Sequence, residues 1–151
     1  MGFIKGGLTL SRYRLTQEPE DLTDEYLIES LTQKAFVDIE KSPEDSSQGW
    51  VNFFDIYSTE FKPESFRFGE FIAFSLRKDS RRLPAKILNR YYQIAEYRFV
   101  AQTGSKPNTF KKKEIKESLR LDLLRRSLLE TQILEVFWAP EKQEVWLGGQ
   151  G

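Results

Sequence analysis

The sequence Arg77-Lys78-Asp79-Ser80-Arg81-Arg82-Leu83-Pro84 lies between two segments with different hydrophobic periodicities. Residues 70–76, before it, form a short apolar run that predicts a central β-strand. Residues 84–101, after it, have the spacing of an amphipathic helix, and Pro84 stands where a helix-opening proline belongs. The stretch therefore predicts a change from sheet to helix, in a fold that mixes the two.

Two helices are expected after this boundary, over about residues 84–101 and 110–129. The segment 103–109 between them contains glycine and proline, which interrupt a helix. Apolar side chains at helical spacing predict the facing surfaces: Leu88, Tyr91, Tyr92, Ala95 and Phe99 on the first helix, and Ile115, Leu119 and Leu123 on the second. The two helices are therefore expected to form a folded projection.

The remaining elements predict a sheet with one N-terminal helix. They are strand 8–15, helix 24–36 capped by Thr23, strand 50–57, strand 70–76, and a closing hairpin of strands 133–138 and 144–147 with its turn at 139–143. Residues 61–68 contain Pro63 and are expected to be irregular. The order β-α-β-β-α-α-β-β predicts a single α+β domain over residues 1–151, with a mainly antiparallel sheet and a basic helical arm at 77–130.

Charge is distributed very unevenly along the chain. Residues 77–126 carry 15 Lys and Arg against 5 Asp and Glu, although the whole chain carries 23 of each. This segment thus has a formal charge of +10, and the rest of the chain has −10. Such an asymmetry favours a charged partner, and a polyanion is the first candidate.

Thirteen side chains are candidates for phosphate contact: Arg77, Lys78, Arg81, Arg82, Lys86, Arg90, Lys111, Lys112, Lys113, Lys116, Arg120, Arg125 and Arg126. The lysines of the second helix could instead form a solvated face, paired with acidic residues one turn away, but such pairs cannot neutralise a charge of +10. For the segment that leads into the first helix, an anion site and a solubilising loop remain equally open. Arg125 or Arg126 could also lie along the edge of the core.

Aromatic residues of the first helix allow two interpretations. Tyr91, Tyr92, Tyr97 and Phe99 could provide stacking surfaces for single strands, but packing in the core is favoured because their spacing is helical.

Composition excludes several classes of function. The chain has no His and no Cys, so Ser–His and Cys–His catalysis, His-containing zinc sites and disulfides are excluded. Neither a P-loop nor a dinucleotide-binding glycine pattern is present. No membrane-spanning run or signal peptide is recognised, and the absence of Cys fits a cytoplasmic protein. We expect no enzyme, no cofactor, no metal and no small-molecule substrate.

Several segments together resemble the recombination-associated RdgC family of bacteria. They are Phe3-Ile4-Lys5, Tyr13-Arg14-Leu15, an acidic helix that ends in Lys34-Ala35-Phe36, Gly49-Trp50-Val51, the basic approach to Leu83-Pro84, the lysine cluster 111–116, Leu123-Leu124, Arg126 and the closing hairpin. The resemblance implies a non-enzymatic protein that binds double-stranded DNA with little sequence preference. It also implies a homodimer that closes into a ring with a basic hole, limits RecA-driven strand exchange and is associated with the nucleoid.

Two features depart from the family pattern. The family chain is about twice as long, and its second half contributes to ring closure. Leu128 stands where the family has a phenylalanine at its finger contact, so a hydrophobic contact remains possible without aromatic stacking. An alternative function is a protein-interaction module, in which the basic arm docks on an acidic partner or on a second copy of the chain.

Overall fold

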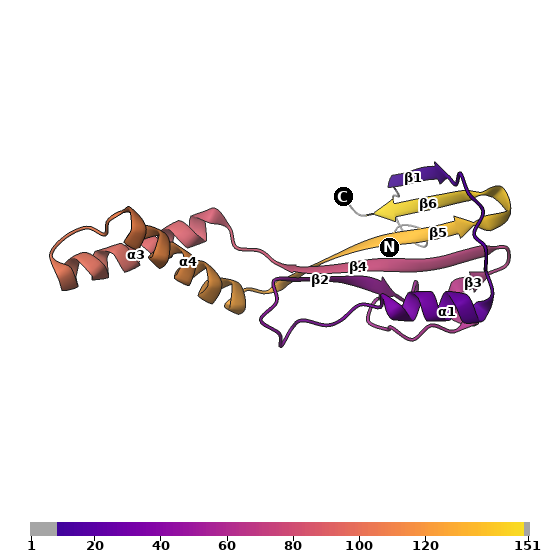
Figure 1. Ribbon diagram of the computed structural model, residues 1–151, viewed down its shortest axis with the longest axis horizontal. Helices are drawn as coiled ribbons and strands as arrows, with labels where there is room; N and C mark the ends of the chain where they lie inside the picture. Colours follow the sequence, from indigo (N-terminus) through magenta and orange to yellow (C-terminus); the bar gives the residue numbers. More distant parts are fainter. Residues whose placement is uncertain (1–8, 150–151) are drawn as a thin grey trace. The chain divides into compact units, whose positions relative to one another are not determined.

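The computed structural model describes residues 9–149 and contains helices and a six-stranded sheet, as the α+β prediction requires (Figure 1). The elements in chain order are β1 (Thr9–Arg14), α1 (Asp24–Gln33), β2 (Ser46–Val51), α2 (Pro63–Phe66), β3 (Arg67–Phe68), β4 (Phe71–Arg81), α3 (Ala85–Thr103), α4 (Thr109–Arg126), β5 (Leu129–Ala139), the 3₁₀ helix Pro140–Lys142 and β6 (Glu144–Gly149). Leu8 and the Phe3-Ile4-Lys5 motif lie outside the described residues.

The sheet has the strand order β1-β6-β5-β4-β2, and β3 pairs with β4. The predicted closing hairpin is confirmed: β5 and β6 pair antiparallel, with Ala139 opposite Glu144 and Val136 opposite Leu147. Gln143 adopts a left-handed conformation at the turn (φ 53°). β1 then pairs antiparallel with β6, which places the first and last described strands side by side.

Helix α1 packs its apolar side on the sheet. Leu27 and Leu31 are buried in one cluster with Ile72 of β4 and with Phe61 and Phe66. Because these positions on α1 are one turn apart, they form one apolar stripe on the inner side of the helix.

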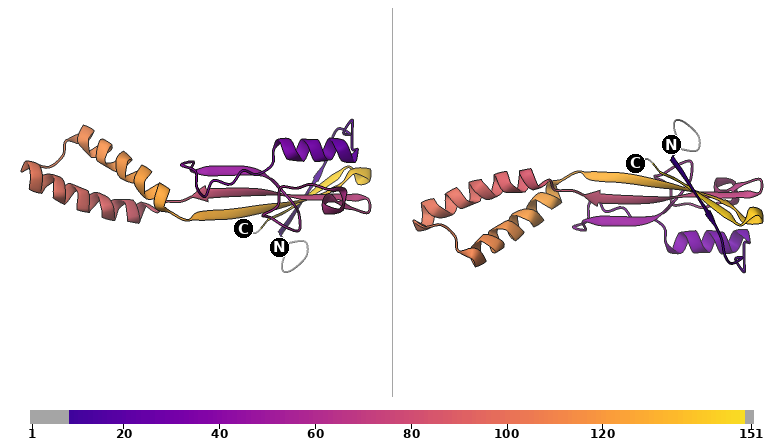
Figure 2. Two further views of the ribbon diagram at one scale, coloured as in Figure 1. Left: turned by 90° about the horizontal axis from the view of Figure 1, so that it is seen from below. Right: turned by 90° about the horizontal axis from the view of Figure 1, so that it is seen from above.

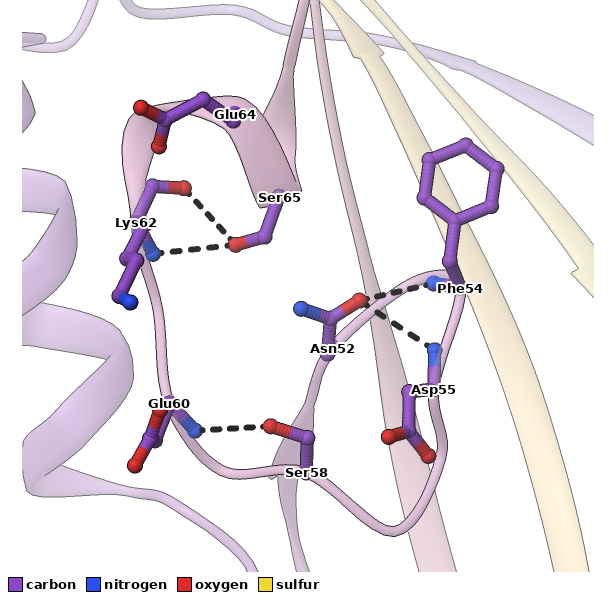
Figure 3. Close-up of a pocket in the computed structure, with 8 residues that line it drawn as sticks. All are labelled: Asn52, Phe54, Asp55, Ser58, Glu60, Lys62, Glu64 and Ser65. Atoms are coloured by element: carbon purple, nitrogen blue, oxygen red, sulfur yellow. Dashed lines mark hydrogen bonds between the residues drawn. The ribbon is translucent and has the colours of Figure 1, made fainter.

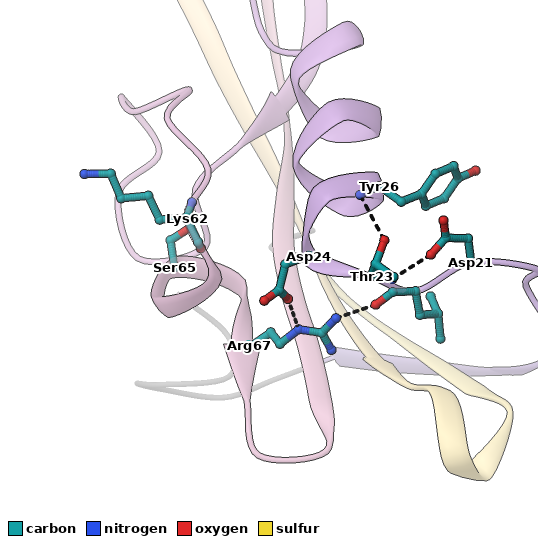
Figure 4. A network of polar contacts seen from close by, with 8 residues as sticks. Asp21, Thr23, Asp24, Tyr26, Lys62, Ser65 and Arg67 are labelled. Carbon is teal, nitrogen blue, oxygen red and sulfur yellow. Dashed lines mark hydrogen bonds and ion pairs between the residues drawn. The ribbon is translucent and has the colours of Figure 1, made fainter.

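The start of α1 is held by polar contacts (Figure 4). The hydroxyl of Thr23 accepts a hydrogen bond from Tyr26 N, as expected for the cap. The guanidinium of Arg67 is ion-paired with Asp24 and also donates to the carbonyl of Leu22. These contacts tie the first turn of α1 to β3.

The expected strand at 50–57 is wrong, because the strand lies earlier, at Ser46–Val51. After Val51, the side-chain oxygen of Asn52 accepts hydrogen bonds from Phe54 N and Asp55 N, and Asp55 accepts one from Tyr57 N. Such side-chain to backbone bonds favour turns over strands, so the aromatic residues here belong to a loop.

Gly49 explains how the polar segment before Val51 forms a strand. A Cβ atom on Gly49 would lie 2.4 Å from the Cα and N of Phe36 and 2.6 Å from the carbonyl carbon of Ala35. On either side of this contact, Trp50 N donates to Lys34 O (2.9 Å) and Phe36 N donates to Trp50 O (3.0 Å). The glycine of the Gly-Trp-Val motif is therefore required because two backbone segments touch.

Replacing Gly49 with alanine is expected to destabilise the protein by about 2–3 kcal/mol, because backbone atoms must move to admit the new methyl group. Urea unfolding followed by tryptophan fluorescence measures the change. Ser46→Ala, at an exposed position of the same strand, serves as the control and should stay within about 0.5 kcal/mol of the wild type. Equal stability of the two variants would contradict the close contact.

The strand that leads to the two helices is longer than expected. β4 continues to Arg81, and Pro84 is the N-cap of α3 rather than its first helical residue. Residues 61–68, expected to be irregular, contain the short helix α2 and strand β3. The predicted loop between residues 77 and 84 therefore shrinks to the residues between Arg81 and Ala85.

The chain divides into two compact units. We call the first the sheet unit; its described residues are 9–39, 46–79 and 131–149. We call the second the arm unit; it consists of residues 40–45 and 80–130 and holds α3, α4 and most of the predicted basic arm.

Candidate nucleic-acid interface

Helices α3 and α4 form the scaffold of the arm unit. Figure 2 shows them joined by a short loop and approaching each other towards the ends at Ala85 and Arg126. Gly104 ends α3 in a left-handed conformation (φ 77°), which glycine adopts without strain. Asn108 caps α4, its side-chain oxygen accepting a hydrogen bond from Lys111 N at 2.8 Å.

The facing surfaces are largely those predicted. Tyr92, Leu123 and Leu124 are buried, and the others are half-buried: Leu88, Ala95, Phe99, Ile115 and Leu119. The expectation for Tyr91 is wrong, because its ring lies on an exposed part of α3. Tyr97, considered as a core candidate, is also exposed.

Three of the predicted phosphate contacts on α4 are paired with carboxylates of the same helix. The pairs are Lys111 with Glu114 at 3.3 Å, Arg120 with Glu117 at 3.2 Å and Arg126 with Asp122 at 2.7 Å. The hydrogen bond from Arg120 lowers the pKa of Glu117, so that carboxylate stays charged. A phosphate must compete with these carboxylates for the three cations.

Lys112, which is exposed, and Lys116, which is half-buried, both reach towards Tyr92 of the other helix. Their ammonium groups lie 5.7 Å and 4.9 Å from the ring centre of Tyr92, within the range of a cation–π contact. The Tyr92 hydroxyl donates a 2.8 Å hydrogen bond to Glu96, and burial together with this bond raises the pKa of the phenol. The two lysines are thus held by a ring, which does not neutralise their charge.

Four further side chains that were predicted to contact phosphate are exposed: Lys86 and Arg90 on α3, and Lys113 and Arg125 on α4. Within residues 9–149, none of these four makes an ion pair, and neither does Lys112 or Lys116. Among the predicted phosphate contacts on α3 and α4, the positive charge without a carboxylate partner therefore rests on these six side chains.

Arg77 lies in the sheet unit and is occupied by internal contacts. Its guanidinium binds Asp79 through two hydrogen bonds, of 3.0 Å and 2.7 Å, and covers the ring of Phe36 at 4.3 Å. Asp79 is 1% exposed and also accepts a 2.8 Å hydrogen bond from Thr131. Burial would raise the pKa of Asp79, but the bonds from Arg77 and Thr131 together outweigh it and hold the pKa below its usual value. These contacts make Arg77 a structural residue, whereas its neighbour Lys78 is exposed.

Arg81 links separate backbone segments of the arm unit through hydrogen bonds. Its guanidinium donates to the backbone carbonyls of Glu40, Ser42, Glu44 and Ser127, at 2.9–3.3 Å. The next residue, Arg82, is exposed and lies 3.7 Å from Glu130. Arg81 and Arg82 are therefore adjacent in sequence but have different surroundings, which sequence alone does not distinguish.

A pocket of about 280 Å³ lies between these arginines and the helix pair. It is lined by Asp45, Arg81, Arg82, Leu83, Leu88, Arg120 and Leu124. Because a carboxylate and three leucines line the pocket together with the cations, the pocket is less suited to a phosphate than the exposed lysines are.

Leu128, the expected finger contact, follows the C-cap residue Ser127 and is 90% exposed. A leucine so exposed is available for a hydrophobic contact with another molecule. Its role in such a contact stays a prediction.

The sheet unit has a larger concavity, of about 620 Å³ (Figure 3). It is lined by Asn52, Phe54, Asp55, Ser58, Glu60, Lys62, Glu64 and Ser65. Asn52, Ser58 and Ser65 use their side-chain oxygens for hydrogen bonds within the loop. Within residues 9–149, no three His, Cys, Asp or Glu side chains gather as a potential metal site.

These features define an α+β protein with a two-helix arm rich in cations. The family model described as "RdgC: Putative exonuclease, RdgC" matches residues 9–149. The chain therefore belongs to the RdgC family, which links it to DNA and recombination. A search of curated proteins finds no match. In the part of the chain that the structure describes, no helix has the length and apolar character needed to cross a bilayer.

Proposed function

We propose that the protein binds double-stranded DNA without sequence preference, through the cations of its arm unit. The observation that carries the proposal is a set of cations on α3 and α4 that have no carboxylate partner within residues 9–149. Two of them lie against the ring of Tyr92, and the other four are exposed. Membership of the RdgC family agrees with such a role.

Binding would proceed by neutralisation of backbone phosphates. Each lysine or arginine that meets a phosphate releases condensed counterions, so the affinity depends on electrostatics. The lysines of α4 act as point charges on flexible stems, which suits phosphate contact better than recognition of base edges. Specificity for sequence should therefore be low.

The family description names an exonuclease, whereas we propose a protein that acts by occupying DNA. The absence of His and Cys from the chain removes the commonest general acid–base group and the thiolate nucleophile. A protein of this kind would obstruct RecA filaments on the DNA it covers, and would work in the cytoplasm at the nucleoid. By family resemblance, it would do so as a homodimer.

Binding and cleavage can be tested together with two labelled 30-bp duplexes of unrelated sequence. We expect dissociation constants that agree within about threefold, since the phosphate contacts carry no sequence information. Incubation of the same duplexes with Mg²⁺ or Mn²⁺ should leave their length unchanged on a denaturing gel. Progressive shortening, abolished by EDTA, would overturn the non-enzymatic part of the proposal. Selective binding of one duplex would overturn the proposed lack of sequence preference.

A further inference from the structure

Helix α3 presents a second apolar stripe that does not face α4. Ile87, Tyr91 and Ile94 follow the i, i+4, i+7 spacing of one helix face and are 43%, 39% and 43% exposed. Tyr97, at the flank of this stripe, is 78% exposed. The residues that face α4, such as Leu88 and Tyr92, lie on a different side of the same helix. A contiguous apolar stripe of this kind typically marks a site of association.

The exposed charged side chains that α3 itself carries are all cationic. Lys86, Arg90 and Arg98 are exposed on α3, and within residues 9–149 none of them makes an ion pair. The one carboxylate of α3 is Glu96, which accepts the hydrogen bond from Tyr92 on the side that faces α4. The α3 stripe is thus an apolar strip with cations along one flank and Arg98 at its C-terminal end, and the one carboxylate of α3 lies on another side of the helix.

This combination differs from the lysine surface of α4 that we propose for DNA, although Lys86 and Arg90 belong to both surfaces. Phosphates need cations and hydrogen-bond donors, and burying Ile87 and Ile94 against a phosphate backbone gains nothing. An apolar strip with flanking cations is instead complementary to a helix that has an apolar face and acidic flanks. The lysines of α4 remain available to DNA when the α3 stripe is covered.

We propose that the α3 stripe docks an acidic amphipathic helix of another protein. The partner would place apolar side chains at i, i+4 and i+7 against Ile87, Tyr91 and Ile94, and its carboxylates against Lys86, Arg90 and Arg98. A second copy of this chain is a poorer occupant. Its α3 would bring like charges together, and the apolar residues of its acidic helix α1, Leu27 and Leu31, are already buried.

An anionic membrane is also a poorer occupant. A helix that lies in a membrane interface inserts a broad apolar face, whereas the three residues of the α3 stripe cover about two turns and are each less than half exposed.

The test uses the full chain and a designed acidic peptide of about 16 residues, with leucines at i, i+4, i+7 and i+11 and glutamates elsewhere. A scrambled peptide of the same composition is the control. Isoleucine-methyl NMR of the protein locates the binding site, because Ile87 and Ile94 belong to the α3 stripe. Ile115, which faces the interior of the helix pair, provides an internal reference. The proposal predicts shifts at Ile87 and Ile94, none at Ile115, and an affinity at least about tenfold higher for the patterned peptide.

The variant Ile87→Ser/Ile94→Ser should bind the patterned peptide about tenfold more weakly and retain the wild-type affinity for duplex DNA. Circular dichroism establishes that the helices persist in the variant. Equal affinity for the two peptides, or an unchanged affinity in the variant, would overturn the proposal and leave DNA binding untouched.

Two other occupants would show themselves in separate measurements. Concentration-dependent dimerisation of the wild type in sedimentation, lost in the double variant, would assign the α3 stripe to a second copy. Binding to vesicles with phosphatidylserine, without binding to the patterned peptide, would assign it to membranes. Either outcome overturns the choice of partner.

Discussion

Replacing Asp79 with asparagine is expected to lower the free energy of unfolding by about 3–5 kcal/mol at pH 7, as for other buried ion pairs that lose one member. Asp79 is 1% exposed and is held by Arg77 and Thr131, so the substitution leaves the largely buried guanidinium of Arg77 without the carboxylate that binds it. Urea unfolding followed by tryptophan fluorescence measures the loss.

Acid should reduce the difference between the wild type and Asp79→Asn. The folded pKa of Asp79 lies below its usual value of 3.8, so the carboxylate stabilises the fold fully above that pH. This stabilisation is lost as the pH falls through the folded pKa, where the wild type comes to resemble the variant. Lys78→Ala, at the exposed neighbouring position, is the control and should change stability by at most about 0.5 kcal/mol. A variant as stable as Lys78→Ala at pH 7 would contradict the role of the buried pair.

Removing charge at Lys112, Lys113 and Lys116 together is expected to weaken duplex binding about 100-fold at 50 mM salt, because about three phosphate contacts are lost. Glutamine is the suitable replacement, since its stem still covers the ring of Tyr92 while the charge is removed. Fluorescence anisotropy with a labelled duplex measures the affinity.

A matched control removes a paired cation together with its carboxylate. Lys111→Gln/Glu114→Gln leaves the net charge of α4 unchanged and should bind DNA within about threefold of the wild type. If the triple variant bound as tightly as this control, α4 would not be the DNA-binding surface.

Sequence patterns correctly predicted the elements whose boundaries are set by nearby residues. The start of the apolar run at residues 70–76, the proline at residue 84 and the break at Gly104 all lie next to element boundaries. β2 was misplaced because its position depends on a long-range contact, in which Gly49 lies against the backbone at Phe36. Strand propensity could not reveal that contact, since the aromatic residues after Val51 are better strand formers than Ser46 or Ser47.

For the candidate site, too, sequence patterns predicted some features, and others depend on long-range contacts. Sequence predicted that the basic charge lies on two helices, but not which cations are occupied. Arg77 and Lys78 are neighbours on β4, yet Arg77 pairs with a buried aspartate and Lys78 is exposed. Pairing on α4 could be read from the i, i+3 and i, i+4 spacing, whereas the contacts of Arg81 with four carbonyls could not.

The exposed face of α3 was missed although its signal is present in the sequence. Ile87 and Ile94 do not belong to the stripe formed by Leu88, Tyr92 and Phe99, so α3 has more apolar residues than one interface requires. The sequence prediction placed Tyr91 on the inner face with Leu88, Tyr92 and Phe99, whereas the structure leaves it exposed like the two isoleucines.

The salt dependence of duplex binding tests the central claim most directly. With about five or six phosphate contacts, the logarithm of the association constant should fall against the logarithm of the salt concentration with a slope of about −5. A slope near zero, or no binding to duplex DNA at 50 mM salt, would contradict an arm that binds DNA through its phosphates.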